Sequence, residues 1–238
     1  MFEHYYAVIM AGGEGSRLWP LSRQLRPKQM VQLGSERSLF QVAVDRIKDI
    51  FPPDRIYVVT VASQAKSLKS QCPEIPEDNY LIEPMPRGTA SVVGLAAVAL
   101  RQRDPQAVMA ILAADHLIQN VSYFQQLLRD AHQLAEDGFL VTLGIRPTYP
   151  ATGYGYIQRG EELAGYPSLV YQVLRFKEKP DEETARTFLI RGDHDWNSGM
   201  FVWRIDRIFE EIKLLMPELA EKLETIAQSW GSLSAGNI

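Results

Sequence analysis

YAVIMAGGEGSRLWP, residues 6–20, begins as an apolar run and continues as a loop rich in glycine. The apolar residues 6–10 predict a buried first strand. Small residues in the loop let backbone N–H groups approach a ligand closely, and consecutive N–H groups in such a turn form a concave anion site. Two cations, Arg17 and Lys28, follow. Backbone donors and cations at the carboxyl end of a first strand predict a polyphosphate site.

Other interpretations of this loop compete with a phosphate site. A glycine-rich turn can be no more than a tight connection. A P-loop requires Lys and then Ser or Thr after its last glycine, whereas Ser16 and Arg17 follow Gly15. A dinucleotide fingerprint that begins at Gly13 needs a third glycine at the position of Leu18. Neither of these two motifs therefore fits.

The composition limits the class of protein. A chain of 238 residues suits one large α/β domain or a domain with a small appendage. Its 46% hydrophobic and 23% charged residues are ordinary for a globular protein. The net charge of −4 gives no general attraction to nucleic acid or to an anionic membrane, so neither partner is expected. The single cysteine, Cys72, excludes an internal disulfide and a cysteine zinc cluster. Without a signal-peptide pattern or a bilayer-spanning apolar run, a cytoplasmic protein is expected.

The order of the patterns predicts an α/β fold. Apolar runs alternate with helical patterns up to residue 145, which indicates a mostly parallel sheet covered by helices. Capping-box spacing predicts helices that open at Ser38 and at Ser122, and a helix from Thr89 is apolar nearly all round, so it should be buried. Two strand-like runs without a helix between them predict a small antiparallel insertion within 147–179. The later strands are expected at 55–61, 80–83, 108–114, 139–145, 154–158, 170–177 and 197–203, and the last helices at 181–190, 206–216 and from Pro217.

The opening loop carries a family resemblance. GGEGSRLWPLSR at 12–23, followed by PKQ at 27–29, is similar to the signature loop of sugar-1-phosphate nucleotidylyltransferases, and its WPLS and PKQ elements resemble the mannose-1-phosphate guanylyltransferase branch. The resemblance implies a Rossmann-like, mostly parallel mixed sheet flanked by helices. It also implies one catalytic domain over 1–238, with a nucleotide-binding half at 1–145 and a sugar-phosphate-binding half at 146–238.

The resemblance also implies which residues bind the nucleotide. The phosphates would be held by the loop residues Ala11, Gly12, Gly13, Gly15 and Ser16. The loop EPMPRGTA at 83–90 resembles the family's base-binding loop, which implies contacts from Glu83, Arg87, Thr89 and Ala90. Gly88 stands where many relatives carry Asn or Asp. A purely structural alternative is that Thr89 caps the following helix.

Asp115 directly follows a run of apolar residues at 108–114. A carboxylate at a strand end can cap a turn, or it can bind magnesium, which takes one or two carboxylates together with phosphate oxygens. AADHLI at 113–118 resembles the family's metal-binding segment. This implies that Asp115 holds Mg²⁺ and is catalytic together with Arg17 and Lys28, with His116 as a supporting or packing residue.

Three later segments resemble the sugar side of the same family. They are TGYGYI at 152–157, FKEKP at 176–180 and WNSGMF at 196–201. The resemblance implies that Gly155 lets the backbone approach the sugar and that Glu178 contacts its hydroxyls. It further implies that Lys179 neutralises the sugar phosphate and that the Asn197 side chain forms a hydrogen bond with the sugar.

The implied reaction transfers GMP from GTP to mannose 1-phosphate by magnesium-assisted in-line attack, giving GDP-mannose and pyrophosphate. The family's second metal carboxylate, from a Trp-x-Asp-x-Gly type segment, is not found, so the chain is expected to lack a C-terminal part. The alternatives are another nucleotide or sugar specificity, a catalytically weak nucleotide-sugar-binding fragment or regulatory subunit, and a Rossmann oxidoreductase. A homodimer is one arrangement that the apolar faces of the late helices would allow.

Overall fold

The computed structural model describes residues 2–13, 20–23, 27–34, 36–85 and 88–230. The chain divides into two compact units, the first formed by Met1–Leu140 with Val202–Ile238 and the second by Val141–Phe201. The expected halves were divided at residue 145, and the chain after residue 201 instead groups with the first unit. The assignment of nucleotide and sugar binding to separate halves stays a prediction.

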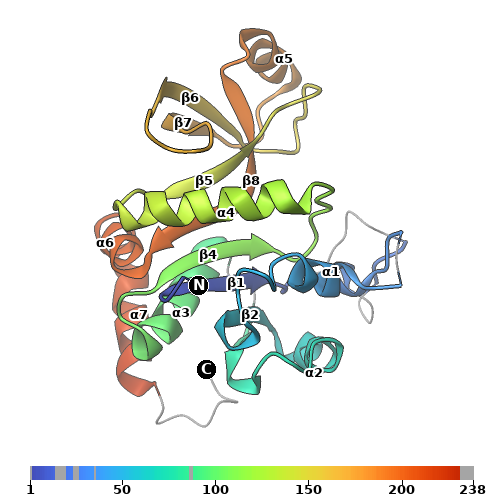
Figure 1. Ribbon diagram of the computed structural model, residues 1–238, viewed down its shortest axis with the longest axis vertical. Coiled ribbons are helices and arrows are strands. Elements are labelled where there is room, and N and C mark those ends of the chain that lie inside the picture. Colours follow the sequence, from blue (N-terminus) through green and yellow to red (C-terminus); the bar gives the residue numbers. More distant parts are fainter. Residues whose placement is uncertain (1, 14–19, 24–26, 35, 86–87, 231–238) are drawn as a thin grey trace. The chain divides into compact units, whose positions relative to one another are not determined.

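The first unit alternates strands and helices, as the sequence predicts (Figure 1). Strands β1, β2, β3 and β4 are parallel and hydrogen-bonded in the order β3-β2-β1-β4, and the end of strand β8 belongs to the same unit. Short 3₁₀ turns lie at Lys28–Met30, Pro53–Arg55 and Glu77–Asn79. The elements are β1 Tyr5–Met10, α1 Leu39–Asp45, β2 Ile56–Val61, α2 Ala62–Gln71, β3 Tyr80–Glu83, α3 Thr89–Arg103, β4 Val108–Ala113, α4 Val121–Glu136, α6 Ile205–Leu215 and α7 Pro217–Ser229.

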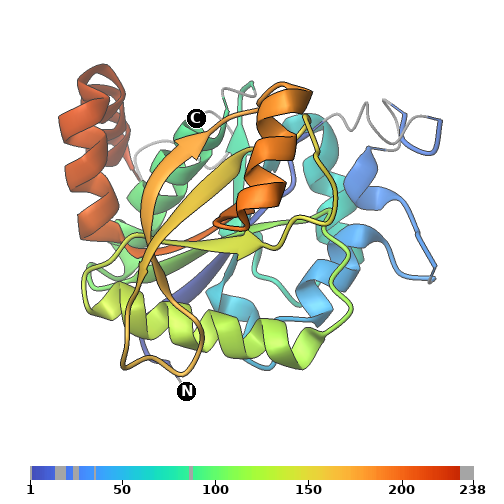
Figure 2. The same cartoon turned by 90° about the horizontal axis from the view of Figure 1, so that it is seen from above.

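Strand β1 is buried on both faces. Successive side chains of a strand point to opposite faces, and the Tyr5 hydroxyl donates to the Leu128 carbonyl of α4, 2.9 Å away. The Tyr6 ring instead lies near Arg103 at the end of α3. Figures 1 and 2 show α4 on one side of these strands and α3 on the other. A strand covered on both faces explains the continuous apolar run that predicts it.

Helix α3 is buried over most of its length, as its apolar composition predicts. Every residue from Val92 to Leu100 is buried. Helices α6 and α7 pack beside it (Figure 1), with Leu223 of α7 in a shared apolar cluster. Gly94 of α3 makes this contact close, because a Cβ there would lie 2.6 Å from Cδ1 of Leu223.

The second unit contains the predicted antiparallel part. Strand β6 pairs antiparallel with both β7 and β8, and β5 pairs with β8. The buried residues Tyr156, Ala185 and Phe188 join β6 to helix α5, whose first turn is capped by Asp181. The elements are β5 Val141–Ile145, β6 Tyr156–Glu162, β7 Tyr171–Lys177, α5 Glu182–Arg191 and β8 His194–Arg204, which ends in the first unit.

Two predicted element starts are wrong for local reasons. The capping box at Ser38 is confirmed, but the one at Ser122 is not, because Asn120 caps α4 by accepting from the Tyr123 N–H. The strand expected from Phe139 begins at Val141. Phe139 donates its N–H to the Leu134 carbonyl, and Gly138 has a φ of 91°, so both belong to the turn that ends α4.

No helix in the described part of the chain combines the length and apolar character that a membrane span requires.

Candidate functional site

Ala11 directly follows β1, and hydrogen bonds to both its N–H and its carbonyl hold the backbone there. The Ala11 N–H donates to the Val59 carbonyl of β2 at 2.8 Å. Its own carbonyl accepts from Gln29 Nε2 at 2.6 Å and from the Thr60 hydroxyl at 3.0 Å. Gln29 and Thr60 are completely buried. Neither was assigned a role from the sequence, although Gln29 lies in the PKQ segment.

Gly12 and Gly13 bring two distant predicted residues to the loop. A Cβ on Gly12 would lie 3.6 Å from Oε2 of Glu83, and one on Gly13 would lie 3.2 Å from Cε of Lys28. The missing side chain of Gly13 therefore leaves room for Lys28, whereas a Cβ on Gly12 would meet Glu83 only at an ordinary van der Waals distance. The remaining predicted phosphate-loop residues, Gly15, Ser16 and Arg17, lie outside the described residues, as does Arg87 of the base loop.

Lys28 and Asp115 form an ion pair. Lys28 Nζ lies 2.5 Å from Oδ2 of Asp115, and the two side chains are 26% and 27% exposed. Burial by itself would raise the pKa of Asp115, but the hydrogen bond and the charge of Lys28 outweigh it and hold the pKa below its ordinary value. Asp115 is therefore ionised at neutral pH. The structure thus places two of the three predicted catalytic residues in contact.

The backbone around Asp115 is held by Arg46, which sequence reasoning missed. Arg46 follows α1, yet its side chain is buried, and it donates to the carbonyls of His116 at 2.6 Å and Ala113 at 3.3 Å. Burial lowers the pKa of the His116 imidazole, although the Asp115 charge opposes this effect. Nothing in the local sequence of α1 distinguishes Arg46 from an exposed cation.

Glu83 is a buried carboxylate at the end of β3. Its exposed fraction is 6%, and burial raises its pKa. Gly88, within the base loop, is the N-cap residue of α3 and has a φ of 90°, a backbone conformation that residues with side chains rarely adopt. Thr89 is the first helical residue and is exposed, and no side-chain hydrogen bond caps this helix, so the structural alternative that Thr89 caps it is wrong. Ala90 lies in the same first turn.

The second unit brings its four predicted residues together, beginning with Gly155, Glu178 and Asn197. The Asn197 N–H donates to the Gly155 carbonyl at 2.8 Å. A Cβ on Gly155 would lie 2.7 Å from Oε2 of Glu178 and 3.5 Å from Cβ of Asn197. Gly155 therefore provides the space that the Glu178 carboxylate occupies. The Asn197 side-chain oxygen accepts from the Gly199 N–H at 3.0 Å, which orients the amide.

Lys179, the fourth residue, has an unusual backbone. Its φ of 41° is the only positive value of a non-glycine residue in the described part of the chain. Such a conformation costs of order 1 kcal/mol or more and is retained where the surrounding structure imposes it. Lys179 Nζ lies 3.2 Å from Oε1 of Glu178, and both side chains are mostly exposed. The two charged groups are thus adjacent and accessible to solvent.

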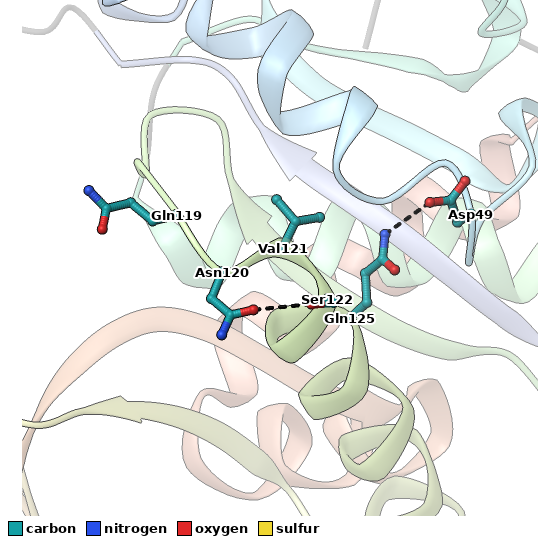
Figure 3. A pocket seen from close by; sticks show the side chains of 6 residues that line it. All are labelled: Asp49, Gln119, Asn120, Val121, Ser122 and Gln125. Atoms are coloured by element: carbon teal, nitrogen blue, oxygen red, sulfur yellow. Dashed lines mark hydrogen bonds between the residues drawn. The ribbon is translucent and has the colours of Figure 1, made fainter.

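A shallow, open cavity of about 620 Å³ lies elsewhere in the first unit (Figure 3). Its lining is polar and includes Asp49, Asn120 and Gln125, with Gln125 Nε2 donating to Asp49 at 3.3 Å. None of the predicted site residues lines this cavity. Within the described ranges, no three His, Cys, Asp or Glu side chains group as they would around a metal ion.

Comparison with known proteins places this geometry in context. The family model described as Nucleotidyl transferase matches residues 6–232. A Klebsiella pneumoniae protein named mannose-1-phosphate guanylyltransferase is 40% identical over 220 residues, which are 90% of this chain and 46% of that protein. A Salmonella montevideo protein of the same name is 44% identical over 216 residues, 87% of this chain and 44% of that one. The chain thus spans about half the length of these curated relatives.

The fold is also found among solved structures. A structure from Thermus thermophilus, described as a mannose-1-phosphate geranyltransferase, superposes with a TM-score of 0.86 at 31% identity. The match covers 98% of this chain and 66% of that one. The mostly parallel mixed sheet flanked by helices, expected from the sequence, is therefore confirmed.

Proposed function

Because this chain belongs to the nucleotidyl transferase family, we propose that it transfers GMP from GTP to mannose 1-phosphate, giving GDP-mannose and pyrophosphate. The names of the relatives from Klebsiella pneumoniae and Salmonella montevideo support this choice of substrates. The observation that carries the proposal is the ion pair of Lys28 and Asp115 beside the Gly12–Gly13 backbone. It combines a lysine ammonium, backbone donors and an ionised carboxylate at the ends of β1 and β4.

The chemistry agrees with these residue types. A phosphate oxygen of mannose 1-phosphate attacks the α-phosphorus of GTP, a new P–O bond forms, and the bond to the bridging oxygen breaks as pyrophosphate leaves with its electrons. The nucleophile is an anion at neutral pH, so no general base is required. The protein must instead bring two polyanions together and stabilise the charge on the transferred group. Cations and backbone amides suit that task.

The first unit is proposed to bind GTP. Arg17 and the amides of residues 12–16 would hold the β- and γ-phosphates, and Lys28 would lie nearer the α-phosphate. Glu83 would accept the two N–H groups of guanine, with Arg87, Thr89 and Ala90 completing the base side. Burial keeps water from competing for the Glu83 carboxylate.

Asp115 fits a magnesium ion that is bound chiefly through substrate phosphates. It is an ionised, partly exposed carboxylate, and its partner Lys28 is a flexible ammonium that a phosphate can attract away. Magnesium often takes only one or two carboxylates, with phosphate oxygens and water as the other ligands. When bound, the ion would supply positive charge to the phosphate oxygens.

The second unit is proposed to bind mannose 1-phosphate. Glu178 and Asn197 would form hydrogen bonds with sugar hydroxyls, and Lys179 would neutralise the phosphate. Gly155 would let the sugar approach the backbone, and its missing side chain leaves room for the Glu178 carboxylate that would bind the sugar hydroxyls. The exposure of Glu178 and Lys179 supports a role in contact with a ligand rather than in the core.

The test is the release of pyrophosphate in the presence of magnesium, measured with each of the four NTPs and with mannose 1-phosphate or glucose 1-phosphate. We expect turnover with GTP and mannose 1-phosphate, and its loss in Asp115→Asn. Turnover with another pair alone would show a different specificity. Tight binding of GDP-mannose without pyrophosphate release from any pair would instead identify a nucleotide-sugar-binding protein.

A further inference from the structure

Arg46 is a buried cation at a position where the sequence suggests an exposed one. It is the residue that ends α1, and only 5% of it is exposed. Burial lowers the pKa of its guanidinium to about 10, although the Asp115 charge opposes this effect. A buried charge is costly unless its donors are satisfied. The groups that accept hydrogen bonds from the guanidinium must therefore offset the cost of burying its charge.

The guanidinium holds the two carbonyl groups that flank Asp115. Nη1 donates to the carbonyl of His116 at 2.6 Å, and Nη2 donates to that of Ala113, the last residue of β4, at 3.3 Å. The guanidinium is planar and its donors form a rigid fork. The two carbonyls are thus held at a fixed spacing, and the turn that presents the Asp115 carboxylate is held with them.

Arg46 is itself fixed by α4. Its guanidinium carbon lies 5.7 Å from the centre of the Phe124 ring, and its backbone carbonyl accepts from Gln125 Nε2 at 2.8 Å. Gln125 is buried as well. The end of α1, the start of α4 and the end of β4 therefore meet at one side chain. This arrangement anchors the backbone of Asp115 independently of Lys28, which contacts only its carboxylate.

We propose that Arg46 is a positioning residue that fixes the Asp115 turn, so that the carboxylate stays in place when Lys28 turns to a phosphate. The inference rests on the proposed function, in which Asp115 holds the divalent cation. Residues that orient a metal ligand without touching the metal typically change metal affinity or activity by about 10- to 100-fold when replaced. Arg46 is not expected to touch either substrate.

The experiment compares wild type, Arg46→Met and Arg46→Lys, with Arg101→Met as the matched control. Arg101 is also an arginine of the first unit with a structural role, since it pairs with Glu224 and lies over Phe209. Binding of Mn²⁺ is measured by electron paramagnetic resonance with GTP present and mannose 1-phosphate absent. The thermal midpoint, kcat and KM for mannose 1-phosphate are measured on the same preparations.

We expect Arg46→Met to bind Mn²⁺ about 10-fold or more weakly and to lose kcat by about 10- to 100-fold, with KM for mannose 1-phosphate changed by about 2-fold or less. Arg101→Met should lower the thermal midpoint and leave Mn²⁺ binding unchanged. Arg46→Lys, which keeps the charge but not the two-pronged fork, should fold and recover only part of the Mn²⁺ affinity.

Two results would overturn the inference. One is an Arg46→Met protein that resembles Arg101→Met, with a lower thermal midpoint and wild-type Mn²⁺ binding. The other applies if Arg46→Met does not fold: wild-type Mn²⁺ affinity in Arg46→Lys would then overturn the inference. Because Mn²⁺ binding needs no turnover, a wild type that binds Mn²⁺ but releases no pyrophosphate would contradict the proposed activity alone.

Discussion

Lys28 and Asp115 neutralise each other although 87 positions separate them in sequence. An ammonium and a divalent cation compete for a single carboxylate. We therefore expect Lys28→Met to bind Mn²⁺ more tightly than wild type when no nucleotide is present. The same variant should lose turnover by about 100-fold or more, since removing one charge-stabilising contact commonly costs about 3 kcal/mol at the barrier.

The matched control for Lys28 is Lys66→Met, which removes an exposed lysine of α2. It should match wild type in both Mn²⁺ titration and pyrophosphate release. Near-normal turnover in Lys28→Met would contradict its assignment to the α-phosphate. Unchanged Mn²⁺ affinity there would show that the ammonium does not compete with the metal.

Burial of the Glu83 carboxylate, which is proposed to bind the guanine base, is expected to lower the free energy of unfolding. Burial raises the pKa of Glu83, so the folded state favours the protonated carboxyl and loses stability as pH rises through that pKa. Glu83→Gln should thus be more stable than wild type at pH 7. The difference should shrink as pH falls through the raised pKa of Glu83, because the wild-type carboxyl then becomes protonated.

Urea unfolding of wild type and Glu83→Gln at a series of pH values measures this difference. Because Gln offers one acceptor and no charge to guanine, the variant should also bind GTP more weakly. Glu77→Gln, at an exposed carboxylate before β3, is the control. A Glu83→Gln protein that is less stable than wild type at pH 7 would refute the expected cost of burial.

At the scale of elements, Gly155 directly precedes β6, and its lack of a side chain leaves space for Glu178. A Cβ there would lie 2.7 Å from the Glu178 carboxylate, whereas the Cβ of an alanine at Gly153 would meet nothing within 4 Å. Gly155→Ala should displace Glu178 and raise KM for mannose 1-phosphate at least about 10-fold, which is about 1.4 kcal/mol of binding free energy. Gly153→Ala should behave as wild type. Equal KM values for mannose 1-phosphate in the two variants would contradict the assignment of Glu178 to the sugar site.

The packing of α3 on α7 is a second element-scale test. Gly94→Ala improves helix propensity by about 1 kcal/mol, but its Cβ would overlap the buried Leu223 side chain. Overpacking in a core typically costs about 1–3 kcal/mol, so we expect a net loss of about 1 kcal/mol in the free energy of unfolding.

Leu223→Ala supplies the control for that clash. Alone it should cost about 2–5 kcal/mol, as other large-to-small core changes do. In the double variant the added Cβ fills part of the space that Leu223 leaves, so the total loss should be smaller than the sum of the two single losses. Strict additivity in a denaturant-unfolding cycle would show that the two side chains do not interact.

At the scale of the whole molecule, the charge balance opposes binding of a polyanion. The net charge is −4, so attraction for GTP must come from local cations and amides. A ligand that binds only the native state stabilises it, by about 2.7 kcal/mol at about 100 times its Kd. GTP with magnesium should therefore raise the thermal midpoint in a concentration-dependent way. Sodium sulfate at matched ionic strength should not, and an equal shift with sulfate would indicate a general anion effect.

The sequence by itself determined the type and approximate position of the elements. Apolar runs report which segments are buried, and β1, β4 and α3 carry such runs over most of their length. Boundaries were less certain because capping depends on a few atoms. Asn120 caps α4 where the spacing favoured Ser122, and both residues are plausible caps in the sequence. The loop after β1 was also identified from its residues, because glycines and cations form a local pattern.

Only the tertiary structure decided which of these residues meet. Lys28 reaches Asp115, Gly12 approaches Glu83, and Arg46 turns inward to the end of β4, all across long separations in sequence. The strand order β3-β2-β1-β4 sets these contacts, because parallel strands bring their carboxyl ends to one edge of the sheet. A sequence pattern records whether a side chain is buried but not which partner it meets. The contact of the Arg46 guanidinium with two backbone carbonyls could therefore not be predicted from the sequence.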